Sequence, residues 1–329
     1  MTTLRIGTRG SALATSQAGD VARAIEAALG IETELVLVTT HGDTSRESLS
    51  QMGGTGVFAS ALREELLAGA CDLVVHSMKD LPTAPYPGLV LASSPERADA
   101  RDTLCARDGL RFAELPPGAR VGTGSPRRAA QLARLRPDLD VRDIRGNVGT
   151  RLGFVTSGEL DAVVLAAAGL ERLGLQDVIT DHFPLETWPT AAAQGALGIE
   201  VRAGDEQGDG LVARAIAAVN RASTMIAATA ERAVLARLEA GCHAPIAASA
   251  VFDEDGELEL TAIVFALDGS AAVESTIRTA IPADVFAFDS SPDYYAENGP
   301  ELLRTAERVG FEAADALLEG GAADIAPLG

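Results

Sequence analysis

The spacing of hydrophobic residues divides this chain into two parts. Up to about residue 201, short apolar runs alternate with longer stretches in which apolar residues recur every three or four positions. This alternation is typical of the successive strands and helices of an α/β fold. Beyond residue 246, three longer runs of strand character follow one another, and a helical stretch comes after them. The second part is therefore predicted to be a small α+β domain.

Local signals set the ends of several predicted helices. Ser11 is a good N-cap for a helix that Gly30 ends, and Ser125 followed by Pro126 marks another helix start. Helices are predicted at residues 12–29, 57–68, 211–220, 223–239 and 301–318. Strands are predicted at residues 4–8, 34–39, 73–75, 88–93, 120–122, 141–144, 161–166, 196–201, 246–252, 257–265 and 272–279. The segment 284–300 is irregular and receives no assignment.

The connections between these elements suggest three domains. The charged run at residues 95–102 reads as a hinge, and the small residues at 190–195 read as a second crossing back to the first lobe. Two α/β lobes joined in this way, like those of periplasmic binding proteins, would enclose a hinged cleft. The predicted boundaries are residues 1–95 plus 196–214 for lobe 1, 100–191 for lobe 2 and 218–329 for the C-terminal α+β domain. The long polar stretch 41–55 is expected to be a mobile lid or a disordered loop.

The net charge of the chain limits the classes of partner that it is expected to bind. The formal net charge is −20, from 47 acidic and 27 basic residues. A surface of this sign repels nucleic acids and anionic membranes, although it is also a common adaptation to salt or a means of solubility. Arginines nevertheless gather between Arg97 and Arg151, against the overall sign. This local excess of positive charge suggests an anionic ligand held in a cleft.

Cysteine use and hydropathy indicate the compartment. Cys71, Cys105 and Cys242 are few and widely spaced, which favours a reducing cytoplasm over a disulfide framework. No apolar run approaches the roughly 20 residues that span a bilayer, and the N-terminus lacks the apolar core of a signal peptide. No Cys/His spacing resembles a metal site. We therefore expect a cytoplasmic protein without a bound metal.

The stretch from Leu73 to Leu81 carries the first candidate chemistry. It contains Lys79, the only lysine among the 27 basic residues, and Asp80 follows directly. Lysine is a compact point charge whose pKa changes on burial, whereas arginine is a planar fork that stays charged. A charged pair at the carboxyl end of a buried strand is where open α/β sheets place ligand sites. The alternative, a chance lysine paired on a solvated turn, remains open from these residues alone.

Three predicted strand-to-helix turns could hold anions. Arg9, Ser11 and Gln17 belong to the first, Thr123 to Arg128 to the second and Arg145 to Arg151 to the third. Free N–H groups at helix N-termini and paired guanidinium groups both favour carboxylate or phosphate groups. No dinucleotide or Walker glycine pattern is present, so several carboxylates are the better prediction. Helix capping and surface ion pairs are the alternatives.

Cys242, between Gly241 and His243, has two interpretations. Spacing alone favours an inert, packed thiol, as is also expected for Cys71 and Cys105. An exposed thiol serving as nucleophile or attachment point is the other interpretation.

Several long motifs together resemble the porphobilinogen deaminase (hydroxymethylbilane synthase) family. The resemblance covers nearly the whole chain through Ala248 and, more loosely, the remainder. It is carried by IGTRGSALATSQA, VVHSMKDLP, VGTGSPRRAAQLARLRPDL, IRGNVGTRL, AAAGLERLGL, AQGALGIE and RLEAGCHAPI.

The resemblance implies an activity and a cofactor. Members of the family join four porphobilinogen molecules head to tail, release ammonia each time and finally free the linear tetrapyrrole hydroxymethylbilane by hydrolysis. They carry a covalent dipyrromethane cofactor made from their own substrate. The match implies that Cys242 holds this cofactor through a thioether, against the packed-thiol interpretation. It also implies a monomer, with porphobilinogen and the growing polypyrrole as its ligands.

The same match assigns roles to individual residues. Asp80 corresponds to the catalytic carboxylate, which is expected to bind pyrrole N–H groups and to stabilise the positive charge that develops as ammonia leaves. The expected cofactor-binding residues besides Cys242 are Lys79, Thr123, Ser125, Arg127, Arg128, Arg145, Gly146 and Asn147. The expected substrate-binding residues are Arg9, Ser11, Gln17, Arg151, Arg172 and Gln194.

Two departures from the family pattern matter. Thr55 stands in the predicted lid where many members have lysine, and Gly124-Ser125 stands where many have Ser-Ser. A competing hypothesis is a hinged cytosolic binding protein for a small polycarboxylate, whose third domain binds partners. A covalent pyrrole adduct would distinguish the enzyme from the binding protein.

Overall fold

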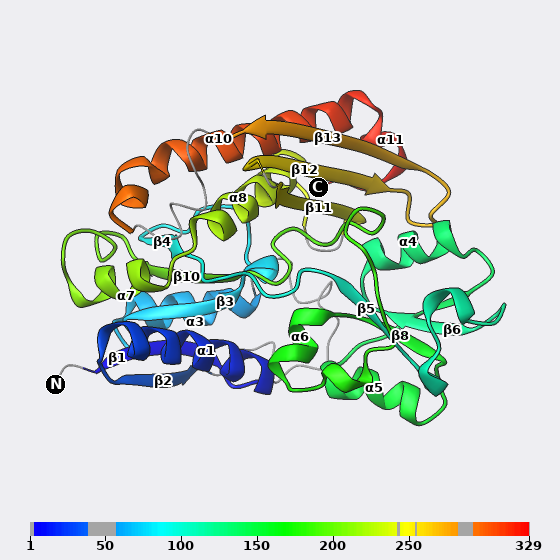
Figure 1. Cartoon of the computed structure of the whole chain (residues 1–329), viewed down its shortest axis with the longest axis horizontal. Helices are drawn as coiled ribbons and strands as arrows, with labels where there is room; N and C mark the ends of the chain where they lie inside the picture. Colours follow the sequence, from blue (N-terminus) through cyan, green and yellow to red (C-terminus); the bar gives the residue numbers. More distant parts are fainter. Residues whose placement is uncertain (1–2, 39–56, 242–243, 254, 282–291, 329) are drawn as a thin grey trace.

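The computed structural model describes residues 3–38, 57–241, 244–253, 255–281 and 292–328. Three β-sheets organise these residues, two with five strands and one with three. Figure 1 shows the two larger sheets side by side, with the three-stranded sheet and its long helix across them. The predicted fold class, two α/β lobes and a small α+β C-terminal domain, is confirmed.

The first sheet has the strand order β2-β1-β3-β10-β4. β1 runs parallel to both β2 and β3, while β10 is antiparallel to both β3 and β4. Side chains of β3 alternate between a core under α1 and α7 and a core under α3, which is the period expected of a strand covered on both faces. The elements are β1 (Leu4–Arg9), α1 (Ala12–Leu29), β2 (Thr33–Val38), α3 (Val57–Leu67), β3 (Leu73–Ser77), β4 (Leu89–Ser93), β10 (Leu197–Arg202) and α7 (Leu211–Val219).

The second sheet repeats this plan with the order β7-β6-β8-β5-β9. β6 runs parallel to β7 and β8, and β5 is antiparallel to β8 and β9. Helix α4 covers one face, while α5 and α6 cover the other. The elements are β5 (Asp102–Ala106), β6 (Arg120–Thr123), α4 (Pro126–Leu135), β7 (Asp140–Asp143), α5 (Val148–Thr156), β8 (Ala162–Ala166), α6 (Ala167–Arg172) and β9 (Asp181–His182).

The third sheet is an antiparallel meander of β11 (Ile246–Phe252), β12 (Glu257–Phe265) and β13 (Ala272–Ala280). Helices α8 (Ala222–Arg237), α10 (Pro292–Glu319) and α11 (Ala322–Ile325) pack on it around one apolar core. The chain leaves the first sheet after β4 and returns to it with β10. This course is compatible with the domain boundaries given above, which stay a prediction.

One local prediction was wrong. Residues 292–300 are helical rather than irregular, because α10 begins at Pro292 and continues through Pro300. The buried Leu302, Val309 and Leu317 pack this helix against the third sheet, which outweighs the backbone hydrogen bond that proline removes. The hinge prediction for 95–102 extends into β5, which begins at Asp102. Residues 41–55 and 284–291 lie outside the described residues.

Candidate active site

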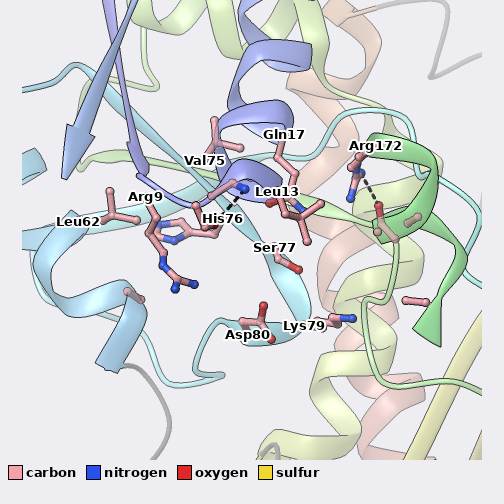
Figure 2. A pocket seen from close by; sticks show the side chains of 17 residues that line it. Arg9, Leu13, Gln17, Leu62, Val75, His76, Ser77, Lys79, Asp80 and Arg172 are labelled. Atoms are coloured by element: carbon pink, nitrogen blue, oxygen red, sulfur yellow. Dashed lines mark hydrogen bonds between the residues drawn. The ribbon is translucent and has the colours of Figure 1, made fainter. Parts of the chain in front are cut away.

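A cavity of about 120 Å³ lies where the first two sheets meet. The carboxyl ends of β1 and β3 and the first turns of α1 form one side of it, and residues from Ala166 and helix α6 form the other. β1 and β3 are parallel neighbours, so the residues that follow them are brought to the same edge of the sheet. The cavity brings together six of the residues assigned above: Arg9, Ser11, Gln17, Lys79, Asp80 and Arg172 (Figure 2).

Helix α1 begins at this cavity. Ser11 is its N-cap, and the Ser11 hydroxyl accepts a hydrogen bond of 3.3 Å from the backbone N–H of Ala14. Gln17, one turn further along, is 6% exposed and lines the same cavity. The capping interpretation of this turn is therefore confirmed, and anion binding by it stays a prediction.

Lys79 and Asp80 lie in a single 3-10 turn, Met78–Asp80, directly after β3. Burial lowers the pKa of Lys79, and the neighbouring Asp80 raises it. The Asp80 side chain is exposed at the cavity and has no hydrogen bond or ion pair with any side chain that the structure describes. A carboxylate in this position is available to a ligand, and Figure 2 shows Arg9, at the end of the neighbouring strand β1, near it.

Arg172 closes the far side of the cavity at the end of α6. Its Nη2 donates to the carbonyl of Gly195 at 2.9 Å, and its own carbonyl accepts a hydrogen bond of 2.7 Å from the Ser16 hydroxyl. Burial lowers the pKa of Arg172, whereas Asp20 and Glu171 raise it. Arg172 thus joins lobe 2 to α1 and to the second crossing.

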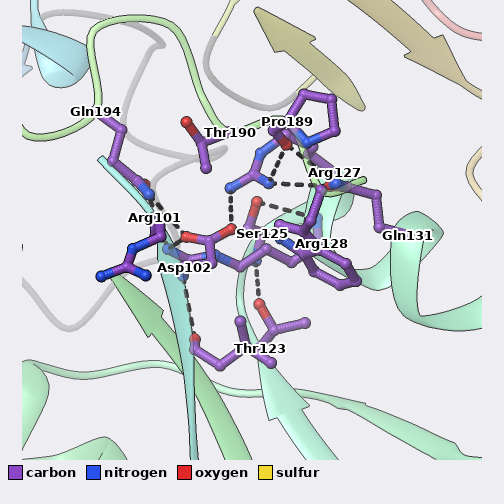
Figure 3. A network of polar contacts seen from close by, with 12 residues as sticks. Arg101, Asp102, Thr123, Ser125, Arg127, Arg128, Gln131, Pro189, Thr190 and Gln194 are labelled. Atoms are coloured by element: carbon purple, nitrogen blue, oxygen red, sulfur yellow. Dashed lines mark hydrogen bonds and ion pairs between the residues drawn. The ribbon is translucent and has the colours of Figure 1, made fainter. Parts of the chain in front are cut away.

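Arg127 and Arg128 do not line this cavity. Both guanidinium groups bind Asp102, Arg127 at 2.8 Å and Arg128 at 2.6 Å (Figure 3). The Asp102 carboxylate also accepts hydrogen bonds from Gln194 at 2.8 Å and from the Trp188 indole at 2.9 Å. Burial raises the pKa of Asp102, but the two arginines outweigh it and hold that pKa far below its usual range. The residue stays charged, and Gln194 acts within this network.

The positive charges of the two regions still influence one another. Arg128 lowers the pKa of Lys79 and that of Arg151, in each case after burial as the larger cause. The charge of Arg128 therefore acts both on Lys79 in the cavity and on Arg151 in α5. The Nε groups of Arg127 and Arg128 are buried and donate no hydrogen bond within the described residues.

The remaining residues assigned to the site form the turns before α4 and α5. Ser125 caps α4 and binds the Thr123 hydroxyl through its N–H at 3.2 Å. Asn147 caps α5 by accepting from the N–H of Thr150 at 2.9 Å. Arg151 Nε donates to the carbonyl of Gly146 at 2.8 Å. The exposed Arg145 belongs to the same turn, which leaves this region open to solvent.

Gly124 has a structural reason to depart from the family's serine. A Cβ atom at this position would lie 2.5 Å from the carbonyl oxygen of Ile144. A side chain there requires the two turns to separate, so the missing hydroxyl accompanies a closer approach of the backbone.

Three buried acidic residues were missed by the sequence reasoning. Asp102 was counted in a solvated hinge, Glu200 lies within the apolar run of β10, and Glu231 lies within α8. Glu200 binds Arg63 at 2.7 Å and lies 3.1 Å from His76, which lines the cavity. Glu231 binds Arg97 at 2.8 Å. A lone carboxylate inside an apolar run was the available signal, because such a group requires a buried partner.

Two of the three cysteines, Cys71 and Cys105, are buried in the core. Cys71 and Cys105 are 0% and 2% exposed, and burial raises the pKa of their thiols to about 11 and about 12. The prediction that both belong to the core is confirmed. Cys242, Thr55 and the lid 41–55 lie outside the described residues. Within the described ranges, no group of three or more His, Cys, Asp or Glu side chains could hold a metal ion.

Comparison with known families identifies the chain. Residues 4–209 match the family profile described as porphobilinogen deaminase, dipyromethane cofactor binding domain, and residues 225–289 match the profile of the porphobilinogen deaminase C-terminal domain. The chain belongs to the porphobilinogen deaminase family. The family named from the motifs is therefore confirmed, together with its dipyrromethane cofactor.

Curated relatives of this family match over almost the full chain. Porphobilinogen deaminase of Leifsonia xyli is 62% identical over 99% of this chain and 94% of that protein. Porphobilinogen deaminase of Thermobifida fusca is 51% identical over 98% of this chain and 96% of that protein.

Solved structures of other proteins share a weaker likeness. A periplasmic sulfonate-binding protein from Methylobacillus flagellatus is 13% identical, with a TM-score of 0.38 over 66% of each chain. A periplasmic substrate-binding protein from Coxiella burnetii is 13% identical, with a TM-score of 0.42 over 66% of this chain and 91% of that one. Among the described helices, none by itself is long and apolar enough to cross a membrane, and α7 with α8 meets that test only as a pair bent by 86°.

Proposed function

We propose that this protein condenses porphobilinogen stepwise into hydroxymethylbilane on a covalent dipyrromethane primer. In each condensation the aminomethyl C–N bond breaks, ammonia leaves, and a new C–C bond forms at the free α-carbon of a pyrrole, which then loses its proton. Water releases the finished tetrapyrrole. Family membership over nearly the whole chain supports this activity.

One observation in the site carries the proposal. Asp80 presents a carboxylate without a protein partner among the described residues, in a cavity lined by Lys79, Arg9 and Arg172. Pyrrole substrates carry acetate and propionate groups that need cations, while their N–H groups and the positive charge developing on ammonia loss need an acceptor. A single carboxylate among several cations meets both needs.

Asp80 is the proposed catalytic residue. Its oxygens accept hydrogen bonds from pyrrole N–H groups and stabilise the cation formed as the C–N bond breaks. Asp80 is also the proposed acceptor of the proton that leaves the ring carbon.

The cations divide into two groups by their present contacts. Arg9, Lys79 and Arg172 line the cavity together with Ser11 and Gln17, and we assign them to the carboxylates beside Asp80. Arg127, Arg128 and Arg145 lie in or beside the turns that precede α4 and α5, and we assign them to the cofactor, together with Thr123, Ser125, Gly146 and Asn147. Arg151 and Gln194 stay assigned to the substrate.

The residues present fit a bound dipyrromethane. Its carboxylates suit the exposed Arg145 and the turn around it, which is open to solvent. When bound, the cofactor supplies the nucleophilic pyrrole carbon that starts the chain. Cys242 is the proposed attachment point through a thioether, because it matches the family's cofactor cysteine in the motif RLEAGCHAPI. We also propose that the protein acts as a monomer in the cytoplasm.

Intact-mass measurement tests this function directly. The purified protein should exceed its polypeptide mass by one dipyrromethane unit, and further pyrrole units should add on incubation with porphobilinogen. The Cys242→Ala variant should carry no such mass. A protein that stays at its polypeptide mass before and after incubation would instead behave as the hinged polycarboxylate-binding protein.

Asp80→Asn tests the catalytic assignment. The variant should keep its fold and its cofactor mass, while turnover falls by about 10²-fold or more because the amide cannot balance the developing positive charge. Turnover equal to that of the unaltered protein would remove Asp80 from the mechanism.

A further inference from the structure

The turn that carries Lys79 and Asp80 is held by a side chain from the third domain. Arg232 of α8 donates from Nη1 to the carbonyl of Met78 at 3.1 Å and to that of Leu81 at 2.9 Å. Its Nη2 donates to the carbonyl of Pro82 at 2.7 Å. The three carbonyls flank Lys79 and Asp80 on both sides, so one guanidinium group spans the turn.

Apolar contacts on the same face of α8 complete this attachment. Met225 and Ala228 pack in one buried cluster with Met78 and Leu81. Residues 225, 228 and 232 are spaced by three and four positions, which places them on one helix face. The turn therefore rests on α8 through two apolar side chains and one arginine.

The partners of Arg232 are unusual for an arginine. No carboxylate of the described residues lies within ion-pair distance of it, and its hydrogen bonds go to neutral carbonyls. Burial lowers the pKa of Arg232 to about 10, while Glu200 raises it and Arg63 lowers it. Burying a guanidinium group without a paired carboxylate is unfavourable. The three hydrogen bonds to the turn at residues 78–82 offset part of this cost.

We propose that Arg232 is a positioning residue for the condensation reaction, holding the Asp80 carboxylate in place from the third domain. The proposal rests on the catalytic role given to Asp80 above. Arg232 thus links helix α8 of the third domain to the turn that bears the carboxylate. The guanidinium group reaches the three carbonyls from two separate nitrogens, whereas a lysine ammonium offers its three donors from a single nitrogen.

The structure offers a matched control. Arg202 of β10 also donates to backbone carbonyls, those of Leu66 and Cys71, both at 2.8 Å. These carbonyls belong to the segment that precedes β3, at the end opposite Asp80. Arg202 also pairs with Asp205 at 2.9 Å. Arg202→Met therefore removes two carbonyl contacts of the same kind, together with this ion pair, without touching the turn.

The test compares Arg232→Met, Arg232→Lys and Arg202→Met by steady-state kinetics. In Arg232→Met, kcat should fall by about tenfold or more, because small displacements of a catalytic group are costly. KM for porphobilinogen should change by less than about threefold, since the cavity arginines are untouched. The kcat of Arg232→Lys should lie between that of Arg232→Met and that of the unaltered protein. Arg202→Met should keep the kcat of the unaltered protein.

Amide hydrogen exchange supplies a readout independent of turnover. Peptides that cover residues 78–82 should exchange faster in Arg232→Met and, to a lesser degree, in Arg232→Lys, but not in Arg202→Met. An unchanged kcat, an equal loss in Arg202→Met, or unchanged exchange at residues 78–82 would each overturn the proposal. If Arg232→Met does not fold, the lysine variant decides by the same criteria. Absence of turnover in the unaltered protein would refute the proposed function, while the exchange result would still report on the Arg232 contacts.

Discussion

Replacing Asp102 by asparagine tests how lobe 2 keeps its arginines in place. The carboxylate is 0% exposed and accepts from Arg127, Arg128, Gln194 and Trp188 at 2.6–2.9 Å. Asparagine has nearly the same shape but no charge. One of its two terminal atoms becomes an NH₂ group that faces donors on every side.

The structure sets the size of the effect. Asp102→Asn leaves two guanidinium groups buried without their counter-charge, and removing one partner of a buried ion pair typically destabilises a protein by about 3–5 kcal/mol. The loss should be nearly constant above pH about 4, because the carboxylate is ionised in both the folded and the unfolded protein there. Arg127 and Arg128 should also lose their fixed orientation, so the variant should carry less covalent dipyrromethane.

Urea unfolding followed by circular dichroism measures the first effect, and intact mass measures the second. Asp138→Asn is the control, since Asp138 pairs with Arg136 in the same lobe but at the surface. That variant should unfold at the urea concentration of the unaltered protein. A free energy of unfolding for Asp102→Asn within about 1 kcal/mol of the unaltered protein would refute the reasoning, because it would mean that the buried charges are compensated elsewhere.

Two further predictions concern the buried Glu200 and the close backbone approach at Gly124. Burial raises the pKa of Glu200, but His76 and Arg63 outweigh it and lower that pKa from 4.5 to about 2. Stability on the order of 3 kcal/mol is therefore present above pH 4.5 and lost as the pH falls toward 2; Glu200→Gln should flatten this part of an acid-unfolding curve, and an unchanged slope would contradict the assignment. Gly124→Ser, which restores the family's serine, should destabilise the protein by about 1–3 kcal/mol, because its Cβ meets the Ile144 carbonyl at 2.5 Å. Thermal unfolding measures this loss, and a variant as stable as the unaltered protein would show that the turns separate freely.

Local hydrogen bonds and hydrophobic spacing were sufficient for most of the secondary structure. Ser11 and Ser125 cap the starts of their helices, and Gly30 caps the end of α1, as the sequence predicted. A cap depends only on neighbours a few residues away. The strands 246–252 and 257–265 begin and end as predicted, because the spacing of hydrophobic residues is also a local signal. Sequence motifs alone also identified the family, since ordered runs of charged residues are specific without any knowledge of their partners.

Only the tertiary structure decided which charges meet. Asp102 lies in a charged run that looked solvated, yet it is buried because Arg127 and Arg128, some 25 residues later, fold onto it. Arg232 reaches carbonyls about 150 residues earlier in the chain, and no local pattern announces such a contact. Helix and strand signals act over a few residues, whereas the pairing of buried charges depends on which elements pack together. The sequence therefore determined the elements and the chemistry available to them, and packing decided which arginines line the cavity and which hold it in shape.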